Sequence, residues 1–298
     1  MTRFWHAAST SPGQVRRVNE DSYIAQSPLF AVADGMGGHG SGDLASRLAI
    51  DTLTVAGRLR PLSVEGMLGA LDGANRAIVT YEGNRGMGTT VTGLALVETT
   101  DGDRLMVFNV GDSRVYRLAG GQLQQVTVDH SEVQELVEAG VITRDQARIH
   151  PRRNIVTRAL GTSPPSRPDY WLLAVAPGDR YLICSDGLYS EVPDEHIASL
   201  LTNGGSPQAT ADGLVAAAEV AGGHDNITVI IVDVVGFGDL GEGPYEDQSA
   251  VETTPLSREE LPQQERARQE WPTEDLPRQE WPASGPPKEG FPPWKLPS

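Results

Sequence analysis

Short apolar runs alternate with amphipathic stretches along the first 235 residues of the chain, and together they predict a mixture of strands and helices. Runs rich in valine, isoleucine and leucine predict strands at 29–33, 90–97, 105–110, 114–118, 180–184 and 227–235. Apolar residues at helical spacing predict helices at 43–58, 64–80, 132–139 and 208–221.

The strand pair 105–110 and 114–118 indicates how the sheets are built. An Ala-Gly-Gly-Gln turn and the segment 122–127 follow the pair, which is typical of an antiparallel meander and not of crossover connections. Strands in hairpins, with the helices held apart from them, predict an α+β protein whose antiparallel sheets are covered by helices.

The helix expected at 132–139 has clear start signals. Ser131 is suited to cap it, and Gln134 lies at the position that completes a capping box. Asp129 and His130, just before the cap, are expected to cap and shape the start of the same helix.

The last part of the chain has a different composition. From Gly236 onward it holds 11 of the 21 prolines and no apolar run, so it cannot bury enough surface to offset chain entropy. We therefore expect a globular domain at 1–235 and a disordered, acidic, proline-rich tail at 236–298. Within the tail, Arg-Gln-Glu-Trp-Pro occurs at 268–272 and again at 278–282, either as a docking motif for a partner or as drift in a low-complexity segment.

The net charge is −16, of which the tail, with 13 acidic and 6 basic residues, contributes −7. So acidic a protein gains nothing from the phosphate backbone of nucleic acids or from anionic membrane surfaces, which argues against both partners. Cys184 is the only cysteine, which excludes an intramolecular disulfide. The N-terminus lacks a hydrophobic signal core and no run is long enough to span a membrane, so we expect a cytoplasmic protein.

Four aspartates lie next to strand-like runs that are far apart in the sequence. They stand in Asp34-Gly35, Gly111-Asp112, Asp186-Gly187 and Asp225-Asn226. Three of the four follow a strand and one precedes it, so a fold can bring them to one edge of its sheets. Each motif alone is typical of a turn, but together they predict an oxygen-rich pocket of the kind that binds Mg²⁺ or Mn²⁺.

The lysine content excludes several kinds of phosphate chemistry. The first lysine is Lys288, in the tail, so the domain lacks the lysine of a Walker A loop, of a protein kinase or of a pyridoxal enzyme. Metal-assisted hydrolysis remains, in which two divalent ions share a bridging water. Asp34 is the best candidate for the bridging ligand, and Arg16 can present a fork to a phosphate.

Eight motifs, in order, give the domain a family resemblance. The chain resembles the metal-dependent protein serine/threonine phosphatases of type 2C, and most closely their bacterial members. The matching segments are GQVRRVNEDS at 13–22, ADGMGGHGSGDLAS at 33–46, GTT at 88–90, VGDSRVY at 110–116, DHSEVQELVEAGVIT at 129–143, HPRRNIVTRALG at 150–161, LICSDGL at 182–188 and DNITVI at 225–230.

The resemblance implies a sandwich of two antiparallel β-sheets, flanked on both faces by α-helices, with the metals between the sheet ends. It also implies a flap, at 131–153, that influences substrate choice. For the site it implies roles that we assign residue by residue: phosphate binding by Arg16, bridging of two ions by Asp34 beside the carbonyl of Gly35, binding of the first ion by Asp186 and Asp225, binding of a third ion by Asp112, and contacts through bound water by Glu20 and Asp21.

One position departs from the pattern of many eukaryotic members, whose proposed general acid is a histidine. Met36 stands there, so either His39 or a metal-bound water must supply that proton. The resemblance predicts a Mn²⁺- or Mg²⁺-dependent phosphatase acting on phosphorylated proteins, opposing bacterial Ser/Thr kinases, without a phosphoenzyme. The alternatives are a catalytically weak phosphoprotein-binding protein and a partner-switching regulator on the same fold.

Two further polar residues of the domain have open or local roles. Arg114 either pairs with a nearby carboxylate or is an exposed strand residue. Asn226 is expected to order its loop by bonding to backbone groups, as asparagine does in turns.

Overall fold

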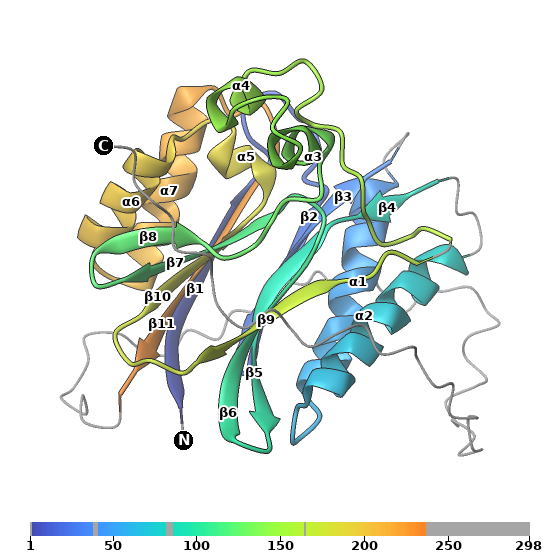
Figure 1. The fold of residues 1–298 in the computed structure, drawn as a ribbon, viewed down its shortest axis with the longest axis vertical. Helices are drawn as coiled ribbons and strands as arrows, with labels where there is room; N and C mark the ends of the chain where they lie inside the picture. Colours follow the sequence, from blue (N-terminus) through green and yellow to red (C-terminus); the bar gives the residue numbers. More distant parts are fainter. Residues whose placement is uncertain (1, 38–40, 82–85, 164, 237–298) are drawn as a thin grey trace. The chain divides into compact units, whose positions relative to one another are not determined.

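The fold is given by a computed structural model, which describes residues 2–37, 41–81, 86–163 and 165–236 (Figure 1). Two sequence predictions, the disordered tail with its repeat and the role of His39, concern residues outside this description. No helix in the described ranges is long and apolar enough to cross a membrane.

The strands form two antiparallel sheets. The first has the order β1-β11-β10-β7-β8, and the second has the order β2-β3-β5-β6-β9 with β4 paired to β3. The strands are β1 (Arg3–Ser11), β2 (Asp21–Gln26), β3 (Leu29–Met36), β4 (Gly88–Thr89), β5 (Val91–Thr99), β6 (Gly102–Val110), β7 (Arg114–Ala119), β8 (Gln122–Gln125), β9 (Asp169–Ala174), β10 (Arg180–Cys184) and β11 (Ile227–Val235).

Helices cover both outer faces of the pair of sheets, and a further group lies at one end (Figure 1). Helices α1 and α2 pack on the second sheet, and α5, α6 and α7 pack on the first. The helices are α1 (Gly42–Gly57), α2 (Val64–Val79), α3 (Glu132–Glu138), α4 (Arg144–Arg148), α5 (Asp186–Tyr189), α6 (Asp194–Asn203) and α7 (Pro207–Ala221). The predicted α+β sandwich is confirmed.

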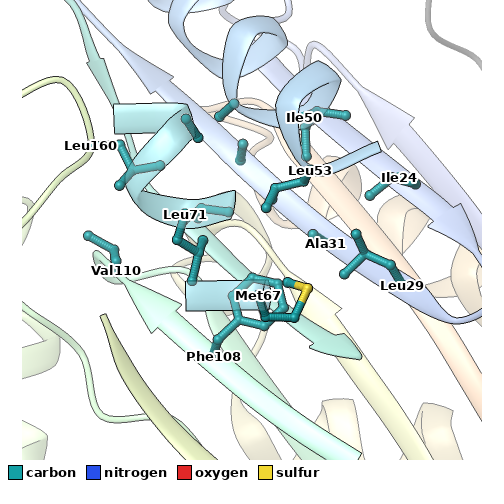
Figure 2. Packing of buried hydrophobic residues seen from close by; sticks show 14 of the residues in the cluster. Ile24, Leu29, Ala31, Ile50, Leu53, Met67, Leu71, Phe108, Val110 and Leu160 are labelled. Atoms are coloured by element: carbon teal, nitrogen blue, oxygen red, sulfur yellow. The ribbon is translucent and has the colours of Figure 1, made fainter. Parts of the chain in front are cut away.

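Strand β3 shows why its sequence reads as a continuous apolar run. Phe30 and Val32 point between the sheets, whereas Leu29 and Ala31 point outward beneath the helices. Figure 2 shows the outward layer, in which Leu53 of α1 and other helix residues pack over the strand. Because both faces of the strand are buried, period-two alternation disappears.

Three of the strands that the sequence did not predict, β1, β2 and β9, are edge strands. β1 is half-buried along most of its length, and β9 alternates between half-buried and exposed residues. An edge strand can leave one side in water, so it needs fewer apolar residues and gives a weaker signal. The short elements β4, α4 and α5 were also missed, as was α6.

Helix α3 begins as predicted, with one difference in its cap. The Ser131 side chain accepts a hydrogen bond from the backbone amide of Gln134. The Gln134 side chain, however, donates to Glu138 and does not return to the cap residue. The complete capping box belongs instead to α4, between Thr143 and Gln146.

Candidate active site

The β2–β3 hairpin places two of the predicted site residues opposite each other. Asp21 opens β2 and is paired in register with Asp34, near the end of β3. The backbone of Asp34 is held by the next strands, because its carbonyl accepts from the Thr90 amide at 2.9 Å and from Thr89 Oγ1 at 2.8 Å. The position of Asp34 is thus fixed by main-chain geometry.

Gly35 allows the end of β3 to touch two other segments. A Cβ atom here would lie 2.2 Å from the carbonyl oxygen of Gly42 and 2.5 Å from that of Glu20, so no other residue fits. The Gly35 amide donates to Glu20 O at 3.2 Å, and Ser46 Oγ donates to the same oxygen at 2.6 Å. The start of α1 and the loop before β2 are therefore packed against the end of β3. That the Gly35 carbonyl binds a cation remains a prediction.

Asp21 joins the two sheets at this end of the sandwich. Its Oδ2 accepts from Ser185 Oγ at 2.8 Å and from Thr228 Oγ1 at 2.6 Å, both in segments of the first sheet. Its Oδ1 is buried and has no hydrogen-bond partner among the residues that the structure describes. Desolvation, reinforced by the charge of Asp186, raises the pKa of Asp21 to about 7 against the opposing effect of the two hydroxyl hydrogen bonds.

Asp34 lies at the centre of a set of carboxylates that repel one another. Desolvation raises the pKa of Asp34 well above its ordinary value, and the charges of Asp21, Asp186, Asp112 and Asp225 raise it further. Desolvation and then the charge of Asp225 raise the pKa of Asp186 to about 6, although a hydrogen bond with Asp34 acts in the opposite direction. We call these five residues the carboxylate set; four distant parts of the sequence contribute to it.

Asp112 is brought to the site by a turn that requires glycine. Gly111 has φ +113°, and a Cβ atom there would lie 2.6 Å from the side chain of Thr90. Asp112 is 5% exposed, and its carbonyl accepts a hydrogen bond from the Tyr189 hydroxyl at 2.9 Å. Desolvation, followed by the charge of Asp186, raises the pKa of the Asp112 carboxyl well above its usual range.

Arg16 and Asp225 form an ion pair at the rim of the site. Arg16 Nη2 lies 2.7 Å from Asp225 Oδ2, and the two side chains are 52% and 35% exposed. The sequence analysis assigned Arg16 to phosphate binding and Asp225 to metal binding, and it did not anticipate that the two side chains pair with each other. Asn226, beside them, donates to the carbonyls of Pro12 and Val18 and accepts from the Glu20 amide, as expected for a residue that orders the loop.

The donor set fits a hard divalent cation by its chemistry. In the described part of the chain, no three carboxylate, imidazole or thiolate side chains meet closely enough to form a ready coordination shell. The side chains of Asp225 and Asp21 are instead engaged by Arg16 and by hydroxyl groups. The free Oδ1 of Asp21 and the raised pKa values nevertheless indicate that the described residues supply too little positive charge or hydrogen bonding for these carboxylates to ionise, and oxygen donors of this kind suit Mg²⁺ and Mn²⁺.

Comparison with known proteins decides the family. A model of the protein phosphatase 2C family matches residues 14–217. The chain belongs to this family.

Bacterial serine/threonine phosphatases are similar to this phosphatase 2C chain. PstP of Mycobacterium tuberculosis is 40% identical over 247 residues, which are 80% of this chain and 46% of PstP, so the chain spans about half the length of that relative. The phosphatase stp of Listeria welshimeri is 36% identical over 239 residues, 75% of this chain and 93% of stp. A crystal structure of the PstP catalytic domain with two manganese ions matches with 38% identity and a TM-score of 0.72, covering 79% of this chain and all of that one.

A half-buried cation connects the site of this phosphatase 2C domain to the start of its flap. Arg114 forms a two-pronged pair with Asp129, with Nε–Oδ1 at 3.0 Å and Nη2–Oδ2 at 2.7 Å. Its guanidinium also lies 3.5 Å from the centre of the Tyr189 ring, whose hydroxyl holds Asp112. Of the two alternatives for Arg114, the paired one is correct. Tyr189 was not anticipated, because nothing in its local sequence marks it.

His130 provides a second connection, and the prediction that Asp129 and His130 cap α3 is wrong. His130 Nδ1 accepts from the Gly111 amide at 3.1 Å, and Nε2 lies 3.2 Å from Asp169 Oδ2. With Nδ1 accepting, the neutral ring carries its proton on Nε2 and donates to Asp169. The side chain of His130 is held by the Gly111 amide and that of Asp129 by Arg114, so the cap is left to Ser131.

Proposed function

We propose that this protein is a Mn²⁺- or Mg²⁺-dependent phosphatase that removes phosphate from serine and threonine residues of proteins and opposes bacterial-type Ser/Thr kinases. Membership of the phosphatase 2C family and the names of its relatives support the reaction class. The observation that carries the proposal is the carboxylate set: acidic groups from distant segments lie together at one end of the sandwich, and desolvation raises the pKa of four of the five, all except Asp225.

The carboxylate set and its neighbours would hold the ions. We assign Asp34, the Gly35 carbonyl, Asp186 and Asp225 to two ions, Asp112 to a third, and Glu20 and Asp21 to contacts through water. Bound there, divalent ions would supply Lewis-acid chemistry, by lowering the pKa of a water molecule and neutralising charge on the phosphoryl group.

Arg16 would bind and orient the phosphate. Its guanidinium is already at the rim, half exposed, and is kept charged by its hydrogen bond with Asp225, which raises its pKa. A phosphate dianion offers two oxygens to the fork in place of one carboxylate oxygen, so substrate binding can compete for this side chain. Arg16 thus fixes the substrate beside Asp225 and the rest of the carboxylate set.

The chain offers no cysteine nucleophile as a rival mechanism. Cys184 is fully buried in β10, and desolvation raises the pKa of its thiol. A thiolate is the reactive form, and this environment disfavours it. Hydrolysis by attack of water therefore agrees better with the residues present than a phosphoenzyme does.

The proposal is tested by phosphate release from p-nitrophenyl phosphate and from a phosphothreonine peptide, with and without Mn²⁺. We expect turnover of both substrates that EDTA abolishes and added Mn²⁺ restores. Turnover that survives EDTA would refute metal dependence. Peptide binding without turnover at any Mn²⁺ concentration would instead establish the catalytically weak phosphoprotein-binding alternative.

A further inference from the structure

The flap and the strand-like segment after it contain a concentration of positive charge. Residues 144–158, which we call the arginine segment, hold five arginines and one aspartate, whereas the rest of the chain holds 19 basic and 39 acidic residues. The segment therefore carries +4 in a protein of net charge −16. A local charge opposite to that of the whole molecule attracts anionic groups to one place on its surface.

Two of the arginines have no side-chain partner among the described residues. Arg152 pairs with Glu132 at 2.6 Å and Arg158 pairs with Asp169 at 3.1 Å. In the described ranges, by contrast, the guanidinium groups of Arg148 and Arg153 make no hydrogen bond or ion pair, and both residues are exposed. Ile149, next to Arg148, is 81% exposed. Two exposed arginines without side-chain partners in the described ranges thus lie on either side of an exposed isoleucine in the sequence.

The chain that contains the arginine segment is hydrogen-bonded to the candidate active site at both ends, at His130 and at Leu160. At its start, the His130 amide donates to Gly111 O at 2.9 Å, one residue from Asp112. At its end, the backbone of Leu160 exchanges hydrogen bonds with Thr89, whose hydroxyl donates to the carbonyl of Asp34. Figure 1 shows α3 and α4 at the same end of the fold as α5, which begins with Asp186. Arg148, the last residue of α4, therefore lies at the same end of the fold as the carboxylate set.

We propose that Arg148 and Arg153, with Ile149 between them in sequence, bind acidic residues near the phosphorylated residue of the substrate, so that the enzyme selects phosphosites in acidic sequence. This inference rests on the proposed phosphatase function and adds the substrate class. A short acidic peptide fits the surface better than a nucleic acid does, because charges are screened within about 8–10 Å in physiological salt. A long polyanion would extend beyond that range over the acidic remainder of the protein.

The test compares two phosphothreonine peptides that differ only in having glutamate or glutamine on both sides of the phosphothreonine. With the full-length, Mn²⁺-loaded protein, we expect kcat/KM to be roughly five- to tenfold higher for the glutamate peptide, as two exposed ion pairs permit. The double variant Arg148→Gln/Arg153→Gln should lower that ratio to about one, while its turnover of p-nitrophenyl phosphate stays that of the unmodified protein.

The control at a remote site is Arg58→Gln, with half the charge change of the double variant. Arg58 is exposed and follows α1, a helix of 16 residues that starts beside Gly35, so it lies about 24 Å along the helix from that end. The Arg58→Gln substitution removes one positive charge and should leave the ratio of kcat/KM for the two peptides unchanged. A ratio of one in the unmodified protein, or a ratio that the double variant does not lower, overturns the inference. Absence of p-nitrophenyl phosphate turnover would instead count against the proposed function.

Binding gives a readout that needs no turnover. Fluorescence anisotropy of the labelled peptides in EDTA should show tighter binding of the glutamate peptide, by a similar factor, and loss of that difference in the double variant. The chain's own tail is the rival occupant, since residues 237–257 hold five acidic and no basic residues. If a peptide of that sequence displaces the probe at a tenth of the concentration that its scrambled version needs, the surface belongs to the tail and the substrate assignment fails.

Discussion

The apolar layers of the sandwich are fully buried and the carboxylate set at its end is largely half-buried, and loss of contact with water has opposite effects in the two regions. Leu53 and Phe108, in the layer beneath α1 and α2, are fully buried, and each such side chain stabilises the fold by about 1.5–3 kcal/mol. At Asp34 and Asp21 the loss of contact with water opposes the charged form and raises the pKa. The first region holds the fold together, and the second is kept at a cost in stability.

The largest expected effect separates activity from stability at Asp34. Asp34→Asn should lower phosphate release at least about 100-fold, because the central oxygen donor of the site loses its charge. The same change should leave the metal-free protein folded and about 1–2 kcal/mol more stable at pH 8, because a desolvated, repelled charge is removed. Phosphate release and urea unfolding measure the two quantities.

Asp103→Asn, at an exposed position of β6, is the control for this pair of effects and should change neither. Retention of more than about a tenth of the rate in Asp34→Asn would count against Asp34 as the bridging ligand.

A substitution in the apolar layers should show the reverse pattern. Leu53→Ala leaves a cavity under α1 and should lower the free energy of unfolding by about 2–5 kcal/mol. Val55→Ala on the same helix, at a residue that is 63% exposed, should change it by less than about 0.5 kcal/mol. Urea denaturation compares the two variants, and equal losses would mean that the packing of α1 is not as described.

The pH dependence of stability should reveal the carboxylate set directly. Asp21 and Asp186 have folded-state pKa values of about 7 and 6, above the value of 3.8 expected for a free side chain. At pH values between 3.8 and about 7 the folded state therefore binds more protons than the unfolded state. The free energy of unfolding falls as pH rises through this range. We expect the metal-free protein to lose about 1–3 kcal/mol between pH 5.5 and pH 8.

Two additions sharpen this measurement, which uses thermal unfolding in EDTA. Asp21→Asn should flatten the dependence, because the amide keeps an acceptor for Ser185 and Thr228 without titrating. Added Mn²⁺ should raise the melting temperature at pH 8 more than at pH 5.5, because cations bind the deprotonated set. A stability that rises with pH in EDTA would contradict the description of the site.

The smallest effect concerns the link between the site and the flap. Tyr189→Phe removes the hydrogen bond to the Asp112 carbonyl but keeps the ring against Arg114, so it should cost about 0.5–1.5 kcal/mol of stability. Tyr170→Phe, at a residue that is 39% exposed, should cost nothing measurable by the same urea titration. If the two substitutions cost the same, the Tyr189 hydroxyl does not hold the turn.

Sequence patterns predicted the centre of the fold well and its margins poorly. The runs that became β3, β10 and β11 are apolar because both faces of each strand are covered, so their signal is strong. β1 and β9 lie at sheet edges, where water satisfies one side and the pattern weakens. The position of a strand in its sheet, which sequence alone does not reveal, therefore decides how strongly its sequence pattern predicts a strand.

For the site, sequence identified residues but not their partners. Asp34, Asp112 and Asp186 were found because an acidic residue beside glycine at a strand end is a local signal. The hydrogen bonds from Ser185 and Thr228 to Asp21 cross 164 and 207 residues, and they depend on how the two sheets are stacked. Contacts of this kind follow from the assembled sandwich, so no local pattern announces them.

The way in which the flap is attached allows it to change without disturbing the chemistry beneath it. Its entry and exit are pinned by main-chain hydrogen bonds, from the Glu132 amide to Ile155 O and from the Thr157 amide to His130 O. Such bonds do not depend on which side chains lie in between. Substitutions among the intervening exposed residues therefore leave these two attachments in place, so the surface that the flap presents can vary while its ends keep their positions.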